Sequence, residues 1–338
     1  MKKLFYIGSP QLGETLFATP ALDFLSKEYE IYLLVSEHVA PVFASYTFIK
    51  KIITCEENWR AKFFNIDTAP LTLQQLKECF GDDPTDVFYA YHHDDDPEMI
   101  KNNAYFKNFK SLNVKKCDSY LWSISRSRKY MVKLGLMQED QLDNFNCTIR
   151  SPNYNKGKSG KLIIYQGSRE PIRRLPDSVI ELFAKLVPNA TFMIEYEVAN
   201  KLKLKQRGFD VVYTKPYHTD NMRSILALLE SGPKAIICPD AGCTQLALRY
   251  KIPMIWLESR VRASIIIDKQ AMNGVKIYRK EFPICECNCD NRKATTEWWN
   301  LKCRLNLQGP CLTYTEEEVK YIISLITEEW LSGLRQLT

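Results

Sequence analysis

Short apolar runs alternate with longer amphipathic stretches along most of this chain. The apolar runs are rich in Val, Ile, Leu, Phe and Tyr, which is typical of strands buried in a sheet. They lie at residues 4–7, 31–35, 51–54, 86–91, 161–166, 191–196, 210–214, 235–240, 254–259 and 275–278. The stretches between them, such as 178–187 and 219–231, have apolar residues at helical spacing. This alternation predicts an α/β fold with doubly wound parallel sheets.

Polar residues mark the starts of two of the predicted helices. Thr219 or Asp220 is expected to cap the helix over 219–231. Thr315 and Glu318 have the spacing of a capping box, and apolar residues recur at helical spacing after them. A last helix is therefore expected to begin at Thr315.

The length of 338 residues suggests about two domains. Residues 151–160 are rich in Pro, Gly, Asn and Ser, and they form the one strong linker signal in the sequence. We therefore expect an N-terminal domain at 1–155 and a second domain at 156–325.

Composition indicates a cytoplasmic protein, bacterial or encoded by a phage in a bacterial host. No apolar run is long enough to span a membrane, and the N-terminus does not resemble a signal peptide. Eleven cysteines without the spacing of a small secreted domain fit a reducing compartment.

The net charge of +6 is unevenly distributed. An acidic cluster at 82–98 precedes a basic stretch at 101–133 that is interleaved with aromatic residues. Two interpretations stay open for the basic stretch. It is either a solvated helix face or a surface for a polyanion, such as a phosphorylated lipid sugar or a nucleic acid.

Two glycine-containing turns follow predicted strands and precede predicted helices. Gly8 and Gly13 bracket the first loop, and Glu14 follows in the first turn of a helix. Asp240 and Gly242 form the second turn. In open α/β sheets, ligands bind where a strand's carboxyl end meets the next helix N-terminus, which favours phosphate. An ordinary βαβ turn with a capping Asp is the alternative for the second turn.

These two turns carry a resemblance to a known family. Residues 8–22, GSPQLGETLFATPAL, and residues 240–247, DAGCTQLA, resemble two motifs of ADP-heptose:lipopolysaccharide heptosyltransferases, glycosyltransferase family 9. The resemblance covers roughly residues 1–325 and is weakest at about 56–155. It implies the GT-B fold, in which two Rossmann-like doubly wound domains face a central cleft. It also implies that a C-terminal helix at 326–338 crosses back onto the first domain.

The resemblance also assigns residues of the first domain. Glu14 stands where the family has its catalytic Asp, which implies that Glu14 is the general base; a helix-dipole role is the alternative. Gln11 and Gly13 are expected to contact the acceptor. His92 and His93 are also expected there, independently of the resemblance; because they precede three aspartates, a metal site and a plain polar loop are the alternatives for them.

In the second domain, the resemblance implies a donor site for a nucleotide-diphosphate sugar. Ser168 and Arg173 match a hydroxyl and a Lys that contact donor phosphates in the family, and Arg174 is adjacent. Gln245 stands where the family usually has His, and Ala241 replaces a residue with a hydroxyl group. These differences suggest a donor other than ADP-heptose or altered contacts to the sugar. The second donor-binding set is Asp240, Ala241, Gly242, Thr244 and Gln245.

A cysteine-rich segment at 285–311 is a separate signal. Clustered thiols in a reducing compartment suggest zinc or iron held by sulfur ligands, and a branch of the same family is described as holding iron through four cysteines. A structural metal and free buried thiols both remain open, and no cofactor is expected for catalysis. The ligand candidates are Cys285, Cys289, Cys303 and Cys311, with Cys287 as a substitute.

The sequence thus predicts an inverting glycosyltransferase, heptosyltransferase-like, that moves a sugar from a nucleotide-diphosphate donor to an acceptor hydroxyl. The expected acceptor is polyanionic: lipopolysaccharide core, protein or DNA. One alternative is a phage-type DNA glycosyltransferase that acts on modified cytosine in duplex DNA. Another is a non-catalytic nucleotide-sugar or nucleic-acid binding protein on a degenerate GT-B fold.

Overall fold

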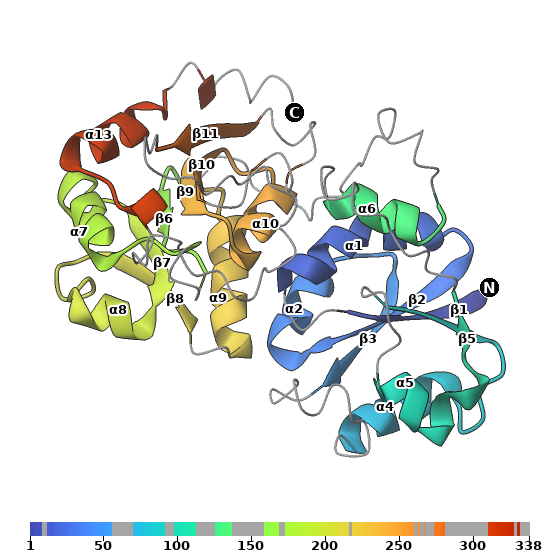
Figure 1. Cartoon of the computed structure of the whole chain (residues 1–338). Coiled ribbons are helices and arrows are strands. Elements are labelled where there is room, and N and C mark those ends of the chain that lie inside the picture. The colour runs from blue at the N-terminus through green and yellow to red at the C-terminus, as the bar shows by residue number, and fades with distance from the viewer. Residues whose placement is uncertain are drawn as a thin grey trace. The chain divides into compact units, whose positions relative to one another are not determined.

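The computed structural model divides into two compact units, each with its own parallel sheet (Figure 1). The structure describes residues 1–8, 12–55, 70–91, 98–112, 126–136, 159–168, 173–215, 218–259, 263, 267, 274–280, 310–327 and 330–331. Described residues through 136 belong to the first unit and those from 159 onward to the second. The expected boundary near 155 lies outside the described residues.

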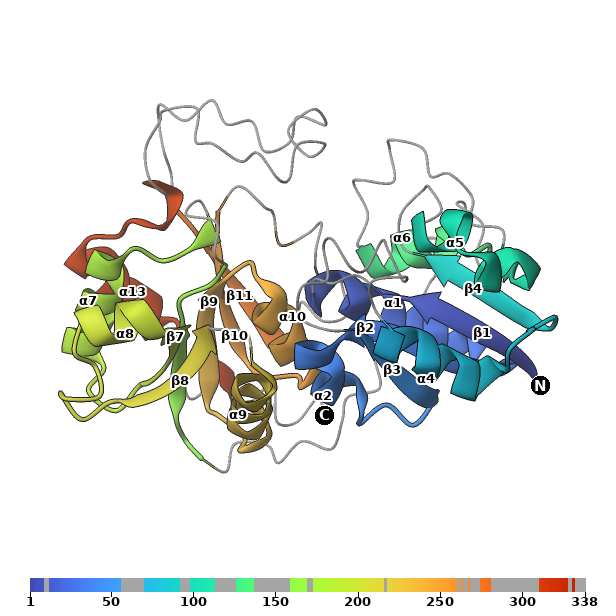
Figure 2. The ribbon, with the colours of Figure 1, turned by 90° about the horizontal axis from the view of Figure 1, so that it is seen from below.

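The first unit has a sheet of strand order β3-β2-β1-β4-β5, and every neighbouring pair is parallel. Its strands are β1 (Lys2–Ile7), β2 (Tyr29–Ser36), β3 (Ile49–Cys55), β4 (Val87–Tyr91) and β5 (Lys110–Ser111). Its helices are α1 (Leu12–Leu25), η1 (Glu37–Val39), α2 (Ala40–Phe43), α4 (Pro70–Phe80), α5 (Glu98–Asn102), η3 (Ala104–Asn108) and α6 (Arg126–Lys133). Helices α1 and α6 lie on one side of this sheet, with α4 and α5 on the other (Figures 1 and 2).

The second unit has a sheet of order β11-β10-β9-β6-β7-β8, which is also parallel throughout. Its strands are β6 (Leu162–Tyr165), β7 (Thr191–Glu195), β8 (Asp210–Lys215), β9 (Ala235–Pro239), β10 (Met254–Glu258) and β11 (Val275–Arg279). Its helices are α7 (Asp177–Leu186), α8 (Tyr196–Lys201), α9 (Thr219–Glu230), α10 (Gly242–Arg249), η8 (Pro310–Leu312) and α13 (Glu316–Ser324). Counted from its own first strand, this sheet has the order 3-2-1-4-5-6 of a dinucleotide-binding fold.

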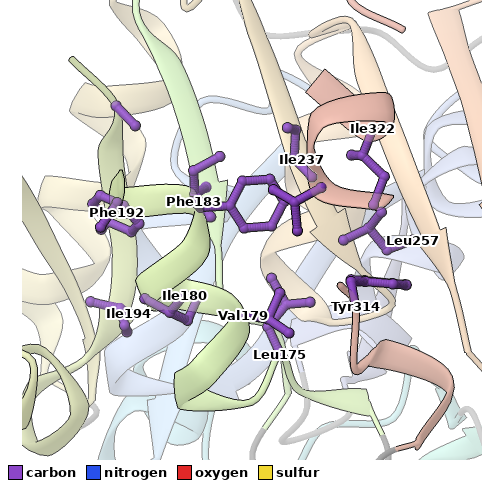
Figure 3. Packing of buried hydrophobic residues seen from close by; sticks show 14 of the residues in the cluster. Leu175, Val179, Ile180, Phe183, Phe192, Ile194, Ile237, Leu257, Tyr314 and Ile322 are labelled. Carbon is purple, nitrogen blue, oxygen red and sulfur yellow. The ribbon is translucent and has the colours of Figure 1, made fainter. Parts of the chain in front are cut away.

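The central strands of the second sheet are buried on both faces, as parallel strands covered by helices must be. All residues of β7, β9 and β10 are buried. Helices α7 and α13 cover one face (Figure 3), and α9 and α10 lie on the other (Figures 1 and 2). The face covered by α7 and α13 forms one apolar core with these two helices. This core includes Val179, Ile180, Phe183, Phe192, Ile237, Leu257 and Ile322.

All ten predicted strands are present, and their doubly wound parallel arrangement is confirmed. The capping box is also confirmed: Thr315 Oγ1 accepts the backbone N–H of Glu318 at 3.2 Å, and Glu318 Oε2 accepts that of Thr315 at 2.7 Å. The short strand β5 was not predicted, because neither Lys110 nor Ser111 carries an apolar signal.

The expected N-cap of the helix over 219–231 was wrong. Helix α9 begins at Thr219, so its N-cap is His218. Asp220 instead lies in the first turn, where its charge complements the helix dipole, and its Oδ1 lies 3.6 Å from Arg223 Nη1.

The predicted crossing of residues 326–338 onto the first unit stays a prediction. Ile326 and Trp330 are half-buried and pack against the core of the second unit, and the Lys276 ammonium lies 4.6 Å from the centroid of the Trp330 ring. Residues 332–338 lie outside the described residues.

Candidate functional site

The strand order places a switch point between β6 and β9, where consecutive connections run to opposite sides of the second sheet. Ligands of doubly wound sheets bind outside the carboxyl ends of the strands at such a point. Ser168 follows β6 and Asp240 follows β9, so the two predicted donor-binding segments meet there. Because β6 and β9 are neighbours in the sheet, the ends of these two segments lie close together although Ser168 and Asp240 are 72 positions apart in the sequence.

The loop after β6 is closed at its base by backbone hydrogen bonds. Ser168 N donates to Arg173 O at 3.1 Å, and Leu175 N donates to Gln166 O at 2.8 Å. Gly167 forms an antiparallel bridge with Arg174. The loop therefore returns both arginines to the carboxyl end of β6.

Gly167 is required at this position for two reasons. Its φ is +105°, a conformation that residues with a side chain rarely adopt. A Cβ there would also lie 2.4 Å from Pro239 Cγ and 2.6 Å from Arg173 O. The missing side chain lets the loop after β6 approach the end of β9.

Arg173 and Asp240 form an ion pair at the switch point. Arg173 Nη1 lies 3.1 Å from Asp240 Oδ2, and the two side chains are 18% and 6% exposed. A mostly buried pair interacts more strongly than a surface pair because water screens it less. The arginine predicted to bind donor phosphate is thus held beside the turn that begins α10.

Arg174 reaches the opposite neighbour of β6. Its Nη1 lies 3.1 Å from Glu195 Oε2, at the carboxyl end of β7. Glu195 also pairs with Lys215 at the end of β8, and its backbone N–H donates to Gln166 Oε1 at 3.2 Å. These partners of Glu195 depend on the strand order, because β7 lies between β6 and β8.

Two buried side-chain amides lie on the segments that follow β6 and β9 at the carboxyl edge of the second sheet. Gln166 is 1% exposed and Gln245, in the first turn of α10, is 4% exposed. Among the residues that the structure describes, the Nε2 atoms of both have no hydrogen-bond partner. A buried donor without a partner costs about 1–3 kcal/mol, so each amide is suited to a bound ligand or water.

The turn from β9 into α10 is held by Thr244. Its hydroxyl is buried and donates to Pro239 O at 2.7 Å. Ala241 is the N-cap, and Gly242 is the first residue of α10. The structure thus gives Thr244 a role in shaping the turn, while its contact with a donor stays a prediction.

Cys238 and Cys243 flank the Asp240 turn and were not singled out from the sequence. Burial raises the pKa of the Cys243 thiol to about 11 and that of Cys238 further. Both thiols are therefore protonated at neutral pH, and they add no negative charge beside Asp240.

The far end of the same edge carries a further ion pair. Arg279 Nη1, at the end of β11, lies 3.8 Å from Glu258 Oε2, at the end of β10. Glu258 Oε1 also accepts the backbone N–H of Ala263 at 2.9 Å. Opposite charges thus face each other along the described carboxyl edge of this sheet.

In the first unit, Glu14 is the third residue of α1 and is half-buried. The Tyr130 hydroxyl, on α6, donates to Glu14 Oε2 at 3.3 Å. Gly13 lies beside it in the same helix. Of the other residues assigned to the acceptor, Gln11, His92 and His93 lie outside the described residues.

The basic stretch at 101–133 is only partly described, and two of its aromatic residues belong to the core. Phe106 and Phe109 are buried and pack against Phe5 of β1. Packing therefore explains Phe106 and Phe109, and their described contacts do not point to a nucleic acid.

The cysteine cluster falls largely outside the described residues. Cys285, Cys287, Cys289 and Cys303 are not described, and Cys311 is half-buried in η8. Within the described ranges, no group of three or more His, Cys, Asp or Glu could hold a metal ion. The structural metal stays a prediction.

None of the described helices is both long enough and apolar enough to cross a membrane.

Comparison with known proteins identifies the fold. No protein-family model matches the chain, and no curated protein matches it. A glycosyl transferase family 9 structure from Veillonella parvula has a TM-score of 0.63 at 14% identity, covering 96% of this chain and 97% of that one. ADP-heptose LPS heptosyltransferase II of E. coli has a TM-score of 0.61 at 12% identity, covering 96% and 98%. E. coli heptosyltransferase WaaC with ADP has a TM-score of 0.57 at 12% identity, covering 96% and 100%. The chain therefore has the GT-B fold of these glycosyltransferases, as its two motifs predicted.

Proposed function

We propose that this chain is a glycosyltransferase that moves a sugar from a nucleotide-diphosphate donor to an acceptor hydroxyl. The ion pair between Arg173 and Asp240 is the observation that carries the proposal. It joins the two segments whose sequences resemble the donor-binding motifs of the heptosyltransferases, at the switch point where this fold binds ligands. The fold itself supports the same activity class.

The ion pairs along the carboxyl edge of the second sheet contain more basic groups than carboxylates, which favours an anionic ligand such as a diphosphate. They join four basic side chains to three carboxylates, so these groups carry one net positive charge. The N-terminus of α10 adds backbone N–H groups beside Asp240. Guanidinium groups bind phosphate oxygens in a fixed fork, which suits Arg173 and Arg174 to a diphosphate leaving group.

The proposed reaction is a single displacement with inversion. The acceptor oxygen attacks the anomeric carbon, and the bond from that carbon to the diphosphate oxygen breaks. The leaving nucleoside diphosphate keeps the electron pair, and its developing charge is offset by Arg173 and Arg174. Glu14 accepts the proton of the acceptor hydroxyl.

The proposed chemistry uses basic side chains where other transferases use a metal ion. We therefore expect turnover to be unchanged after dialysis against EDTA, followed as release of nucleoside diphosphate. Loss of activity that Mg²⁺ or Mn²⁺ restores would assign the charge stabilisation to a metal instead. Restoration by zinc or iron alone would point to the cysteine-rich segment.

The sugar contacts differ from those of the resembled family. Gln245 has an amide in place of the imidazole of His, so it donates and accepts hydrogen bonds without taking up a proton. Its buried Nε2 is suited to a sugar hydroxyl or a phosphate oxygen of the donor. We therefore expect the affinity for the donor to lack the pH dependence that protonation of a histidine near pH ~6.5 would cause.

A ligand screen by thermal shift tests this function. The panel contains ADP, UDP, GDP, CDP and dTDP, their common sugar conjugates, and duplex DNA. A ligand at 100 times its Kd stabilises the fold by about 2.7 kcal/mol, which is a shift of several degrees. We expect a shift with one nucleotide family, reduced in Arg173→Ala and kept in Arg207→Gln, whose arginine pairs with Glu181 on the surface of the same unit.

Two results would overturn the proposal. A shift with duplex DNA and with none of the nucleotides favours a nucleic-acid binding protein. A nucleotide shift without turnover, combined with unchanged affinity in Glu14→Gln, favours a non-catalytic binding protein. When turnover is found, acceptor trials with lipopolysaccharide core, protein and DNA distinguish the remaining substrate classes.

A further inference from the structure

A tyrosine on a second helix contacts the carboxylate assigned as the base. Helix α6 packs against α1 in the first unit (Figure 1), and the Tyr130 hydroxyl donates to Glu14 Oε2 at 3.3 Å. Tyr130 is 6% exposed, whereas Glu14 is half-buried. The hydroxyl thus reaches the carboxylate from the buried side.

Helix α6 is largely buried, and Met131 and Val132 are among its buried residues. Ser127, Tyr130 and Lys133 are separated by three residues each and are all buried. Residues three apart lie on one side of a helix. Although α6 is rich in Lys and Arg, it places the Tyr130 phenol on the side that contacts α1. The packing of α6 against α1 therefore fixes the position of the Tyr130 hydroxyl.

Glu14 has more rotational freedom than the Asp that it replaces in the resembled motif. The additional methylene adds one torsion, and a free torsion spreads the carboxylate over several staggered positions. Each such torsion must be fixed before the carboxylate can meet an acceptor hydroxyl in one geometry. A hydrogen bond to one of the two oxygens supplies that constraint and leaves lone pairs on the carboxylate for the acceptor proton.

We propose that Tyr130 is a positioning residue for Glu14. Its hydroxyl holds Oε2 and thereby orients the carboxylate that takes the proton from the acceptor. The donated hydrogen bond also favours the ionised form, which is the form that acts as a base. The proposal rests on the proposed function, since it needs Glu14 to be the base.

The test compares Tyr130→Phe with the wild type, using the nucleotide sugar that gives the thermal shift. Release of nucleoside diphosphate is followed with water as the acceptor. We expect kcat to fall about tenfold, which is about 1.4 kcal/mol, with KM for the donor within about twofold. We also expect the acid limb of the kcat profile to move to higher pH, because the ionised carboxylate has lost a donor.

A matched tyrosine–glutamate pair in the same unit provides the control. The Tyr32 hydroxyl donates to Glu30 Oε2 at 3.2 Å, on strand β2. Tyr32→Phe removes an equivalent hydrogen bond, and it should leave both kcat and the pH profile unchanged. Circular dichroism and melting temperature check that both variants fold.

Glu14→Asp provides a second, independent test. The shorter side chain withdraws from Tyr130, so Tyr130→Phe should add no further loss in that background. Additive losses would overturn the positioning role. In protein carrying 13Cζ-labelled tyrosine, the Tyr130 resonance should also shift in Glu14→Gln while that of Tyr32 stays fixed; an unshifted resonance rules out the hydrogen bond without any need for turnover.

The failures of the two proposals are distinguishable. If Glu14→Gln retains full turnover, the base assignment in the proposed function is wrong. If Glu14→Gln abolishes turnover and Tyr130→Phe matches the wild type in rate and pH profile, only the positioning role is wrong.

Discussion

Arg173 and Arg174 are adjacent in the sequence, yet their side chains bind carboxylates on opposite sides of strand β6. Arg173 pairs with Asp240 after β9, and Arg174 pairs with Glu195 at the end of β7. The two carboxylates lie on opposite sides because β9 and β7 are the two neighbours of β6. One short loop thus connects the carboxyl ends of three strands, with the guanidinium group of Arg173 at the switch point and that of Arg174 on the β7 side of β6.

The Arg173–Asp240 pair predicts opposite effects on nucleotide affinity. Arg173→Ala removes the side chain that we propose binds the diphosphate, and it should weaken nucleoside diphosphate binding about 10- to 100-fold. Asp240→Asn removes the carboxylate that competes with the nucleotide's phosphates for Arg173. The sugar-free nucleotide should therefore bind a few-fold more tightly. Isothermal titration calorimetry measures both affinities, with Glu181→Gln, from a surface pair, as the control. Weaker binding of the sugar-free nucleotide by Asp240→Asn would contradict this role.

Gly167→Ala should be strongly destabilising. The positive φ and the close approach to Pro239 both oppose a Cβ, and we expect a loss of about 2–4 kcal/mol in the free energy of unfolding. Gly208→Ala is the matched control, because Gly208 also has a positive φ but no atom within 4 Å of its Cβ position. Its expected loss is about 1 kcal/mol. Urea denaturation followed by circular dichroism measures the two values, and equal losses would show that the contact with Pro239 is unimportant.

Gln245→Met should separate stability from binding. The substitution removes a buried amide whose Nε2 has no partner among the described residues, and it keeps a similar side-chain volume. We expect the ligand-free protein to gain about 1 kcal/mol in stability, while the thermal shift produced by the nucleotide sugar becomes smaller. Met lacks the amide that could hydrogen-bond a polar ligand. An undiminished thermal shift would therefore place Gln245 outside the donor site.

Glu318→Gln should flatten the acid dependence of stability. Burial raises the pKa of Glu318, but the backbone N–H of Thr315 and the Lys280 ammonium at 3.0 Å outweigh it, so the pKa is lowered on folding. A carboxyl whose pKa falls on folding stabilises the protein above its unfolded pKa of about 4.3, and this contribution is lost as pH falls through the folded pKa.

Urea midpoints between pH 7 and about pH 3 test this dependence. Glu318→Gln should be less stable than the wild type at pH 7, and the difference should shrink as the pH falls. Glu317→Gln, at the exposed position before Glu318 in α13, is the control; it keeps the Lys280 contact of Glu318, so its difference from the wild type at pH 7 should be smaller than that of Glu318→Gln. A constant difference between Glu318→Gln and the wild type would contradict the assignment.

The sequence by itself determined the strands and the two turns. Ten of the eleven described strands were predictable because apolar periodicity is local, and Asp240 and Gly242 stand out because turn chemistry is local as well. Locality also explains the errors: the N-cap of α9 is His218 and not Thr219 or Asp220, and β5 has no apolar signal. These features position the donor-binding segments along the chain without joining them.

Only the tertiary structure decided which side chains meet. Glu195 pairs with Arg174 and Lys215 because β7 lies between β6 and β8. The periodicity of a single strand does not determine the order of strands in a sheet. Tyr130 reached Glu14 across 116 residues because α6 packs beside α1. Such contacts depend on the packing of distant segments, and this is the physical reason why the sequence predicted the fold and the candidate residues, while the pairing between them required the structure.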